Sequence, residues 1–156
     1  MEKDLKILVV DGSRASRSMI RSTLAAHHHT GQVQVAAVSS AGEALCCLAN
    51  EKFDIITCAL QLPDMDGIDL CRTIRAQPIH RFTPFIVVTA EPHERHMKDG
   101  FRAGVTDYYD KTHGMHEFVP FMRGLVERYT ALSGKVLYVE DSDLEAAIMA
   151  DMMERH

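Results

Sequence analysis

The sequence lacks the features that mark several classes of protein. It has no apolar run of about 18 residues, the length that a membrane-spanning helix requires. Its charged opening, residues 1–4, is not followed by a signal-peptide cleavage pattern. Its 17 lysines and arginines are outnumbered by 22 acids, and the net charge of −5 argues against a nucleic-acid partner. We therefore expect a cytoplasmic chain whose partners include neither membrane nor nucleic acid.

Cysteine and histidine are present, but not in the spacings of a disulfide framework or a metal centre. The 4 cysteines include no Cys-x-x-Cys pair, which predicts buried, reduced thiols. Among the 9 histidines, His93/His96 and His113/His116 form pairs spaced by three, without an evident third ligand. We therefore expect no metal site.

Short apolar runs alternate with helical patterns along most of the chain. Strands are predicted at 5–10, 33–38, 54–60, 84–89 and 105–109. Helices are predicted from a cap at Ser13 to the histidines at 27–29, and then at 40–50, 68–76, 92–104 and 117–132. Because strands that are apolar along their whole length are covered on both faces, this order predicts a doubly wound α/β fold with a five-stranded parallel sheet.

In such a fold, functional side chains gather at the carboxyl ends of the strands. The residues at those ends are Asp11, Ala59, Thr89 and the pair Asp110-Lys111. They are the candidates for a functional site.

The end of the chain repeats its beginning. Segment 135–142 (KVLYVEDS) matches segment 6–13 (KILVVDGS), and a helical apolar pattern follows each of them. A repeat of this length indicates tandem domains rather than a solenoid. We predict a first domain over 1–132 and, over 133–156, a linker with the first strand and helix of a truncated second domain. The alternative is an unrelated tail helix.

Four segments resemble the receiver domain of two-component response regulators, over residues 5–132. They are ILVVDGSR (7–14), FDIITCALQLPDMDGIDLCRTIR (53–75), PFIVVTA (84–90) and AGVTDYYDKT (103–112). The resemblance implies a flavodoxin-like or CheY-like fold with strand order 2-1-3-4-5. It also implies an aspartate at the end of the third strand that takes a phosphoryl group from a histidine kinase. Two adjacent carboxylates would hold Mg²⁺, and a hydroxyl and a lysine would bind the phosphoryl group.

This sequence keeps only part of that apparatus. Asp11, Thr89 and Lys111 match the first carboxylate, the hydroxyl and the ammonium, but Gly12 stands in place of the second carboxylate. Ala59 occupies the acceptor position, and an alanine methyl cannot be phosphorylated. The charges of Asp11 and Lys111 cancel, so we expect their side chains to pair and Mg²⁺ binding to be weak or absent. We predict a pseudo-receiver that is not an enzyme and has no catalytic residue.

A receiver without an acceptor would act through its contacts. The resemblance implies a switch and interaction face formed by the fourth helix, the fifth strand and the fifth helix. Its candidates are Tyr108, Phe118, Phe121 and Met122, although each apolar residue could instead belong to the core. We expect a regulatory module that dimerises through the fifth helix or the C-terminal fragment. Its expected partners are an adjacent receiver, an output domain and a histidine kinase.

The second copy of the repeat differs from the first in its acids. Glu140 and Asp141 restore the adjacent pair that Asp11 and Gly12 have lost. The resemblance therefore implies a silent first receiver followed by a phosphorylatable second one.

Other interpretations remain open at this point. The chain could be a phosphorylatable receiver with an unrecognised acceptor or an engineered Ala59, although Asp64 and Asp66 lie in a loop where the family often has acids. A haloacid-dehalogenase-like phosphatase needs a second acid where Ser13 stands. A flavodoxin needs a hydroxyl-rich loop after the first strand, and this chain lacks one.

Overall fold

A computed structural model of the chain describes residues 4–26 and 32–131. It divides into two compact units, Met1–Val119 and Pro120–His156. The first unit contains a parallel sheet in the order β2-β1-β3-β4-β5, which confirms the predicted doubly wound fold. The strands are β1 (Leu5–Val10), β2 (Val33–Val38), β3 (Ile55–Ala59), β4 (Phe85–Thr89) and β5 (Asp107–Asp110).

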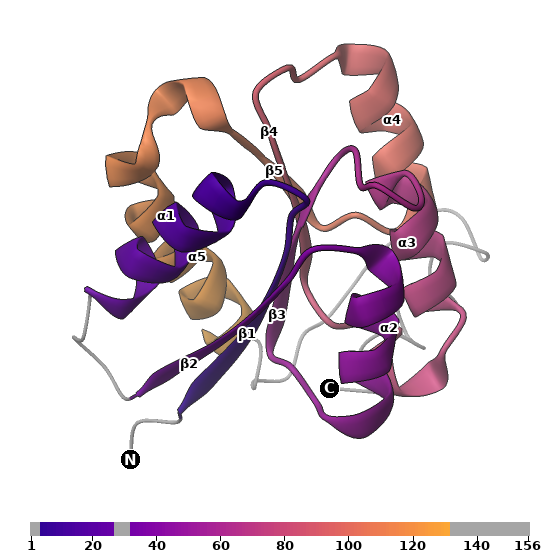
Figure 1. Ribbon diagram of the computed structural model, residues 1–156, viewed down its shortest axis with the longest axis horizontal. Coiled ribbons are helices and arrows are strands. Elements are labelled where there is room, and N and C mark those ends of the chain that lie inside the picture. Colours follow the sequence, from indigo (N-terminus) through magenta and orange to yellow (C-terminus); the bar gives the residue numbers. More distant parts are fainter. Residues whose placement is uncertain (1–3, 27–31, 132–156) are drawn as a thin grey trace, which may run out of the picture. The chain divides into compact units, whose positions relative to one another are not determined.

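Helices cover both faces of this sheet. The α-helices are α1 (Arg14–Ala25), α2 (Ala41–Asn50), α3 (Gly67–Arg75), α4 (Glu94–Ala103) and α5 (Met115–Ala131), and two 3₁₀ turns are η1 (Pro78–His80) and η2 (Lys111–His113). Helix α1 covers one face, and α2, α3 and α4 cover the other (Figure 1). Helix α5 begins in the first unit and continues into the second.

The element boundaries follow local hydrogen bonds. The predicted cap at Ser13 is confirmed, because its hydroxyl accepts from the Ser16 amide at 3.2 Å. Strand β5 begins two residues later than the apolar pattern predicts, since the Val105 amide donates to the Gly100 carbonyl instead of to the sheet. That bond closes the end of α4 around Gly104, whose φ of 103° is the left-handed conformation that glycine adopts most readily.

Side chains alternate between the two faces of the sheet. On the face covered by α2, α3 and α4, a buried apolar cluster includes Leu8, Val10, Ile56, Leu70 and Val87. Thr57 faces the opposite way and is 1% exposed. Within the described residues, its hydroxyl is the one buried side-chain oxygen that has no hydrogen-bond partner. A buried hydroxyl without a partner destabilises the fold.

Replacing this hydroxyl by a methyl group is expected to stabilise the protein. Thr57→Val keeps the shape of the side chain and its β-branch while it removes the unpaired oxygen. We expect the free energy of unfolding to rise by about 1 kcal/mol, which urea denaturation followed by circular dichroism would measure. Thr57→Ser, which keeps the oxygen and loses the methyl, is the control and should lower stability. A loss of stability in Thr57→Val would mean that the hydroxyl has a partner.

The predicted second domain lies outside the described residues. The boundary between the two units falls inside α5, at Pro120, whereas the sequence places a domain boundary after Leu132. The repeated strand and helix over 133–156, with Glu140 and Asp141, therefore stay a prediction. In the part of the chain that is described, no helix has the length and apolar character needed to span a bilayer.

Candidate functional site at the carboxyl ends of the strands

The candidate residues lie at the edge of the sheet formed by the carboxyl ends of its strands. Asp11 directly follows β1, Ala59 ends β3, Thr89 ends β4, and Lys111 directly follows β5. The register of β3 with β4 places Thr89 one residue beyond the partner of Ala59. The fold thus gathers residues from four strands, as the parallel topology predicts.

Asp11 is the buried centre of this site. It is 5% exposed, and both of its carboxylate oxygens accept hydrogen bonds. Oδ1 accepts from the Ser13 amide at 2.8 Å, and Oδ2 lies 3.3 Å from the Lys111 ammonium. The Arg17 guanidinium donates to the Asp11 main-chain carbonyl at 2.7 Å. The carboxylate is therefore already bound within the fold, and the predicted pairing with Lys111 is present.

Lys111 has a second partner that the sequence did not indicate. Its ammonium donates to the hydroxyl of Ser16, on the first turn of α1, at 3.2 Å. The next residue, Thr112, donates from both its amide and its hydroxyl to the Asp110 carboxylate, at 2.8 and 2.7 Å. The receiver domains that this sequence resembles usually have proline at the position of Thr112, and proline could not supply that amide. These bonds fix the start of η2, and with it Lys111.

Ala59, whose side chain is a methyl group, is half-buried at the end of β3. The neighbouring Cys58 thiol donates to the Ala59 carbonyl at 3.1 Å. Burial raises the pKa of this thiol well above its ordinary value, which keeps it protonated and poorly nucleophilic. The Thr89 hydroxyl, one strand away, accepts from the Glu91 amide at 3.1 Å.

The two acids in the loop after β3 are both helix caps. Asp64 accepts from the amides of Ala41 and Gly42, at 3.0 and 2.9 Å, at the start of α2. These amide bonds hold the pKa of Asp64 below its ordinary value. Asp66 accepts from the Ile68 amide at 2.7 Å and so begins α3. Each carboxylate already has a structural role, which weighs against either of them as a substitute acceptor.

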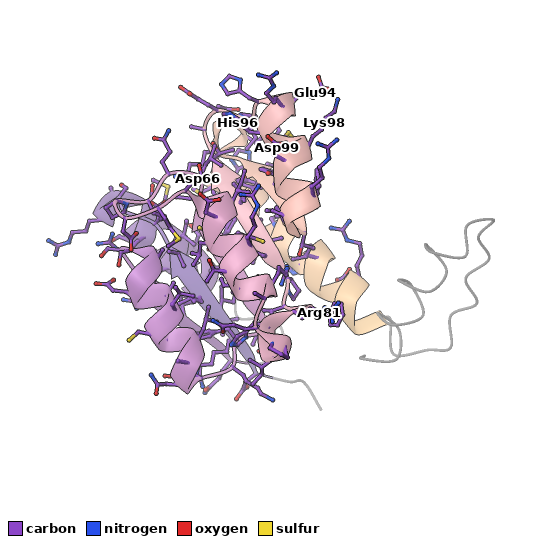
Figure 2. All side chains as sticks on the ribbon, turned by 90° about the vertical axis from the view of Figure 1, so that its right-hand side faces the viewer. Asp66, Arg81, Glu94, His96, Lys98 and Asp99 are labelled. Atoms are coloured by element: carbon purple, nitrogen blue, oxygen red, sulfur yellow. The ribbon has the colours of Figure 1, made fainter. Side chains whose placement is uncertain are left out.

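Tyr108, the centre of the predicted switch face, is half-buried against α4. Its hydroxyl donates to the His96 carbonyl at 3.1 Å, and its ring packs edge-on against Phe101 at 5.3 Å. The ring occupies a space left by Gly100, where an added Cβ would lie 1.7 Å from the hydroxyl. Figure 2 shows His96 on α4, with the exposed Lys98 projecting from the same helix.

Filling the space at Gly100 is expected to displace the Tyr108 ring. Burial raises the pKa of the Tyr108 phenol to about 12. In Gly100→Ala we expect the ring to leave α4 for water and this pKa to fall toward the ordinary value of about 10. A phenolate absorbance titration would measure the change, with Gly100→Ala/Tyr108→Phe as the control that identifies the shifted group. An unchanged titration would mean that the helix moves and the tyrosine stays.

Two residues expected on the interaction face are buried instead. Phe118 is 0% exposed, and its ring packs edge-on against Tyr109 at 5.0 Å. Met122 is 4% exposed. Phe121 is half-buried. Phe118 and Met122 are therefore buried, a correction to the expected face, whereas Phe101 on α4 is 49% exposed.

No cluster in the described part of the chain has the composition of a metal centre. Among these residues, no three histidine, cysteine, aspartate or glutamate side chains lie where they could hold an ion together. His93 and His96 pack ring against ring at 5.7 Å, an aromatic contact of two side chains.

The geometry and the sequence both match a known family. The response regulator receiver domain matches residues 7–122. The transcriptional regulatory protein ResD of Bacillus subtilis is 31% identical over 130 residues, which are 83% of this chain and 51% of that protein. Response regulator MprA of Mycolicibacterium vanbaalenii is 30% identical over 130 residues, 83% of this chain and 54% of that protein. The chain thus spans about half the length of these curated relatives.

Solved structures agree with this match. The chemotaxis response regulator CheY4 of Vibrio cholerae is 26% identical, with a TM-score of 0.69 over 79% of this chain and 99% of that one. A response regulator structure from Chloroflexus aurantiacus is 27% identical, with a TM-score of 0.71 over 79% of this chain and 98% of that one. From the matched residues, the parallel sheet and the site at its edge, we conclude that this chain belongs to the response regulator receiver domain family of two-component signalling.

Proposed function

We propose that this receiver is not phosphorylated and works as a regulatory protein-interaction module next to a second receiver. The observation that carries the proposal is the methyl group of Ala59 at the end of β3, where the family has its acceptor carboxylate. The nearest alternatives are occupied, because Asp64 and Asp66 cap helices and the Cys58 thiol is buried and protonated. These structural roles weigh against each of these side chains as the nucleophile of phosphoryl transfer.

The small number of acidic side chains in the site leads us to expect that Mg²⁺ binds weakly or not at all. Mg²⁺ prefers several oxygen ligands in near-ideal octahedral geometry and gives up its water reluctantly. Asp11 is the one carboxylate that comes from the matched positions, and it already accepts from Ser13 and Lys111. Gly12 and Ala59 add no ligand atoms from their side chains. The donors present do not fit the ion, and we propose that the domain has no resident cofactor and is not an enzyme.

The proposal is tested by a phosphoryl donor in the presence of Mg²⁺. Incubation with acetyl phosphate, followed by intact mass measurement, should give no phosphoryl adduct on the wild-type chain. Gly12→Asp/Ala59→Asp is the matched control, since it restores both missing carboxylates. Transfer would join a carboxylate oxygen to phosphorus as the bond from phosphorus to acetate breaks, releasing acetate. We expect a stoichiometric adduct on the double variant.

The restored site is sterically feasible at Gly12. An added Cβ would lie 3.4 Å from Pro63 Cδ and 3.8 Å from the Ser39 carbonyl, close to ordinary contact distances. An adduct on the wild-type chain would overturn the proposal. A double variant that folds and takes no phosphoryl group would refute the assignment of the Asp11, Ala59 and Lys111 positions.

The proposed partners are other domains of two-component signalling. A histidine kinase, an adjacent receiver and an output domain are the partners that membership of the family suggests, and these relatives are about twice as long as the matched region. The repeat of residues 6–13 at 135–142 favours a second receiver as the neighbour. The free thiols of Cys46, Cys47, Cys58 and Cys71 fit the reducing cytoplasm as its location.

The contact surface of this module is proposed around α4 and β5. Phe101, on α4, is 49% exposed, and its ring packs against the ring of the half-buried Tyr108 on β5. The burial of Phe118 and Met122 takes away much of the apolar surface that a homodimer through α5 would need. Size-exclusion chromatography with light scattering of wild-type protein and Phe101→Ser would measure whether this surface supports self-association.

A further inference from the structure

The ammonium of Lys111 is held from two directions. It lies 3.3 Å from Asp11 Oδ2 and 3.2 Å from the Ser16 hydroxyl, and its side chain is 29% exposed. Ser16 is the third residue of α1, one turn after the Ser13 cap. These two hydrogen bonds therefore link the end of β1 and the first turn of α1 to the start of η2.

We propose that Ser16 is a positioning residue for Lys111. Its hydroxyl accepts a hydrogen bond from the ammonium and so replaces one of the acceptors that the missing acidic side chains would supply. An ammonium has three N–H donors, and a partly buried one is costly when its donors are unpaired. With Gly12 and Ala59 at the matched positions, Asp11 is the remaining carboxylate of the site. The Ser16 hydroxyl is neutral, so it accepts a hydrogen bond without adding the negative charge that would favour a cation.

The bonds around Asp11 make this arrangement specific. Asp11 Oδ1 is taken by the Ser13 amide and its main-chain carbonyl by Arg17, which leaves Oδ2 for Lys111. A second N–H of the ammonium then goes to Ser16. As a result, the lysine is held on the α1 side of the site. This inference rests on the proposed function, because a phosphoryl group on this domain would compete for the same ammonium.

Acylation of individual lysines tests the role of Ser16 in the whole chain. An ammonium that donates hydrogen bonds must give them up before its nitrogen can attack an acylating reagent. With N-acetoxysuccinimide and peptide mass analysis, we expect Ser16→Ala to raise the acetylation rate of Lys111 about three- to tenfold, the worth of one hydrogen bond. Lys98, whose side chain is 67% exposed, is the internal reference in the same sample.

Three further variants make the result decisive. Ser16→Thr keeps a hydroxyl and should label Lys111 at the wild-type rate, while Ser18→Ala, an exposed change on the same helix, should leave it unchanged. Asp11→Asn should raise the rate, which establishes that labelling responds to the bonds of this ammonium. If Asp11→Asn raises the rate and Ser16→Ala does not, Ser16 has no positioning role. A phosphoryl adduct on the wild-type chain would instead overturn the proposed function and leave this labelling result standing.

Discussion

Gly67→Ala is expected to destabilise the domain by about 3 kcal/mol, because no side chain fits where α3 begins. A Cβ at this position would lie 2.3 Å from the Ala59 carbonyl oxygen. It would also lie 3.2 Å from the Leu60 carbonyl and from the Cys58 sulfur. The closest of these atoms belongs to the main chain of β3, so the conflict cannot be relieved by a side-chain rotation.

Gly12→Ala is the matched control for this change. It lies at the same edge of the sheet, but its added Cβ meets Pro63 Cδ at 3.4 Å and the Ser39 carbonyl at 3.8 Å. We expect its free energy of unfolding to stay within about 0.5 kcal/mol of wild type. Urea denaturation of both variants measures the difference. Equal stability of the two alanine variants would contradict the close approach of α3 to β3.

The close approach at Gly67 has a consequence for the site. The Gly67 amide donates to the Leu60 carbonyl at 2.7 Å, and Asp66 caps α3 immediately before it. The end of β3, where Ala59 lies, is therefore fixed to the first turn of α3. A carboxylate restored at Ala59 would be carried on this same rigid backbone. For this reason, failure of the restored double variant to accept a phosphoryl group would be informative only if it remains folded.

The order of the elements was predictable because the three central strands, β1, β3 and β4, are buried over most of their length. β4 is buried at every position from Phe85 to Thr89. A continuous apolar run in the sequence predicts a strand of this kind. β5, with the sequence DYYD, is the last strand of the sheet and has one buried residue, Tyr109. The apolar pattern places the start of β5 at Val105, because this residue is apolar and buried. The Val105 amide, however, bonds to the end of α4 and not to the sheet.

The site was predictable where it follows from the ends of the strands. Asp11 and Lys111 are 100 residues apart, and the topology alone brings them to one edge. Ser16 was missed because a serine in the first turn of a helix is typical of a solvent-exposed position. The role of Asp64 was missed for a similar reason, since its partners in α2 are 22 and 23 residues away. Hydrogen bonds such as these two, which do not follow from the ends of the strands, leave no pattern in a single sequence.

The apolar residues of α5 mark a different limit. An amphipathic helix reveals its apolar face, but the sequence does not say whether that face meets the core or a partner. The resemblance places Phe118 on an interaction face, whereas the structure buries it against Tyr109. The exposed Phe101 was not among the candidates, because it lies in a strongly charged helix. The contact between Gly100 and the ring of Tyr108 could not be predicted from the sequence either.

Arg75→Met is expected to lower the free energy of unfolding by about 3 kcal/mol, because this guanidinium joins three segments through main-chain carbonyls. Nη1 donates to the carbonyls of His80 and Thr83 at 2.9 and 2.6 Å. Nε and Nη2 donate to the Gly104 carbonyl at 3.0 and 2.8 Å. Methionine keeps the apolar stem and removes every donor, which leaves partly buried carbonyls without these partners.

Arg72→Met, one turn earlier in α3, separates this role from the general effect of losing a charge. Arg72 pairs with Asp69 at the surface, where the two side chains are 55% and 59% exposed. Such pairs contribute little, so we expect a change within about 0.5 kcal/mol. Hydrogen exchange would locate the effect of Arg75→Met, with faster exchange in the segment that joins α4 to β5. If both variants lose the same stability, the carbonyl contacts of Arg75 do not support the fold beyond the loss of a charge.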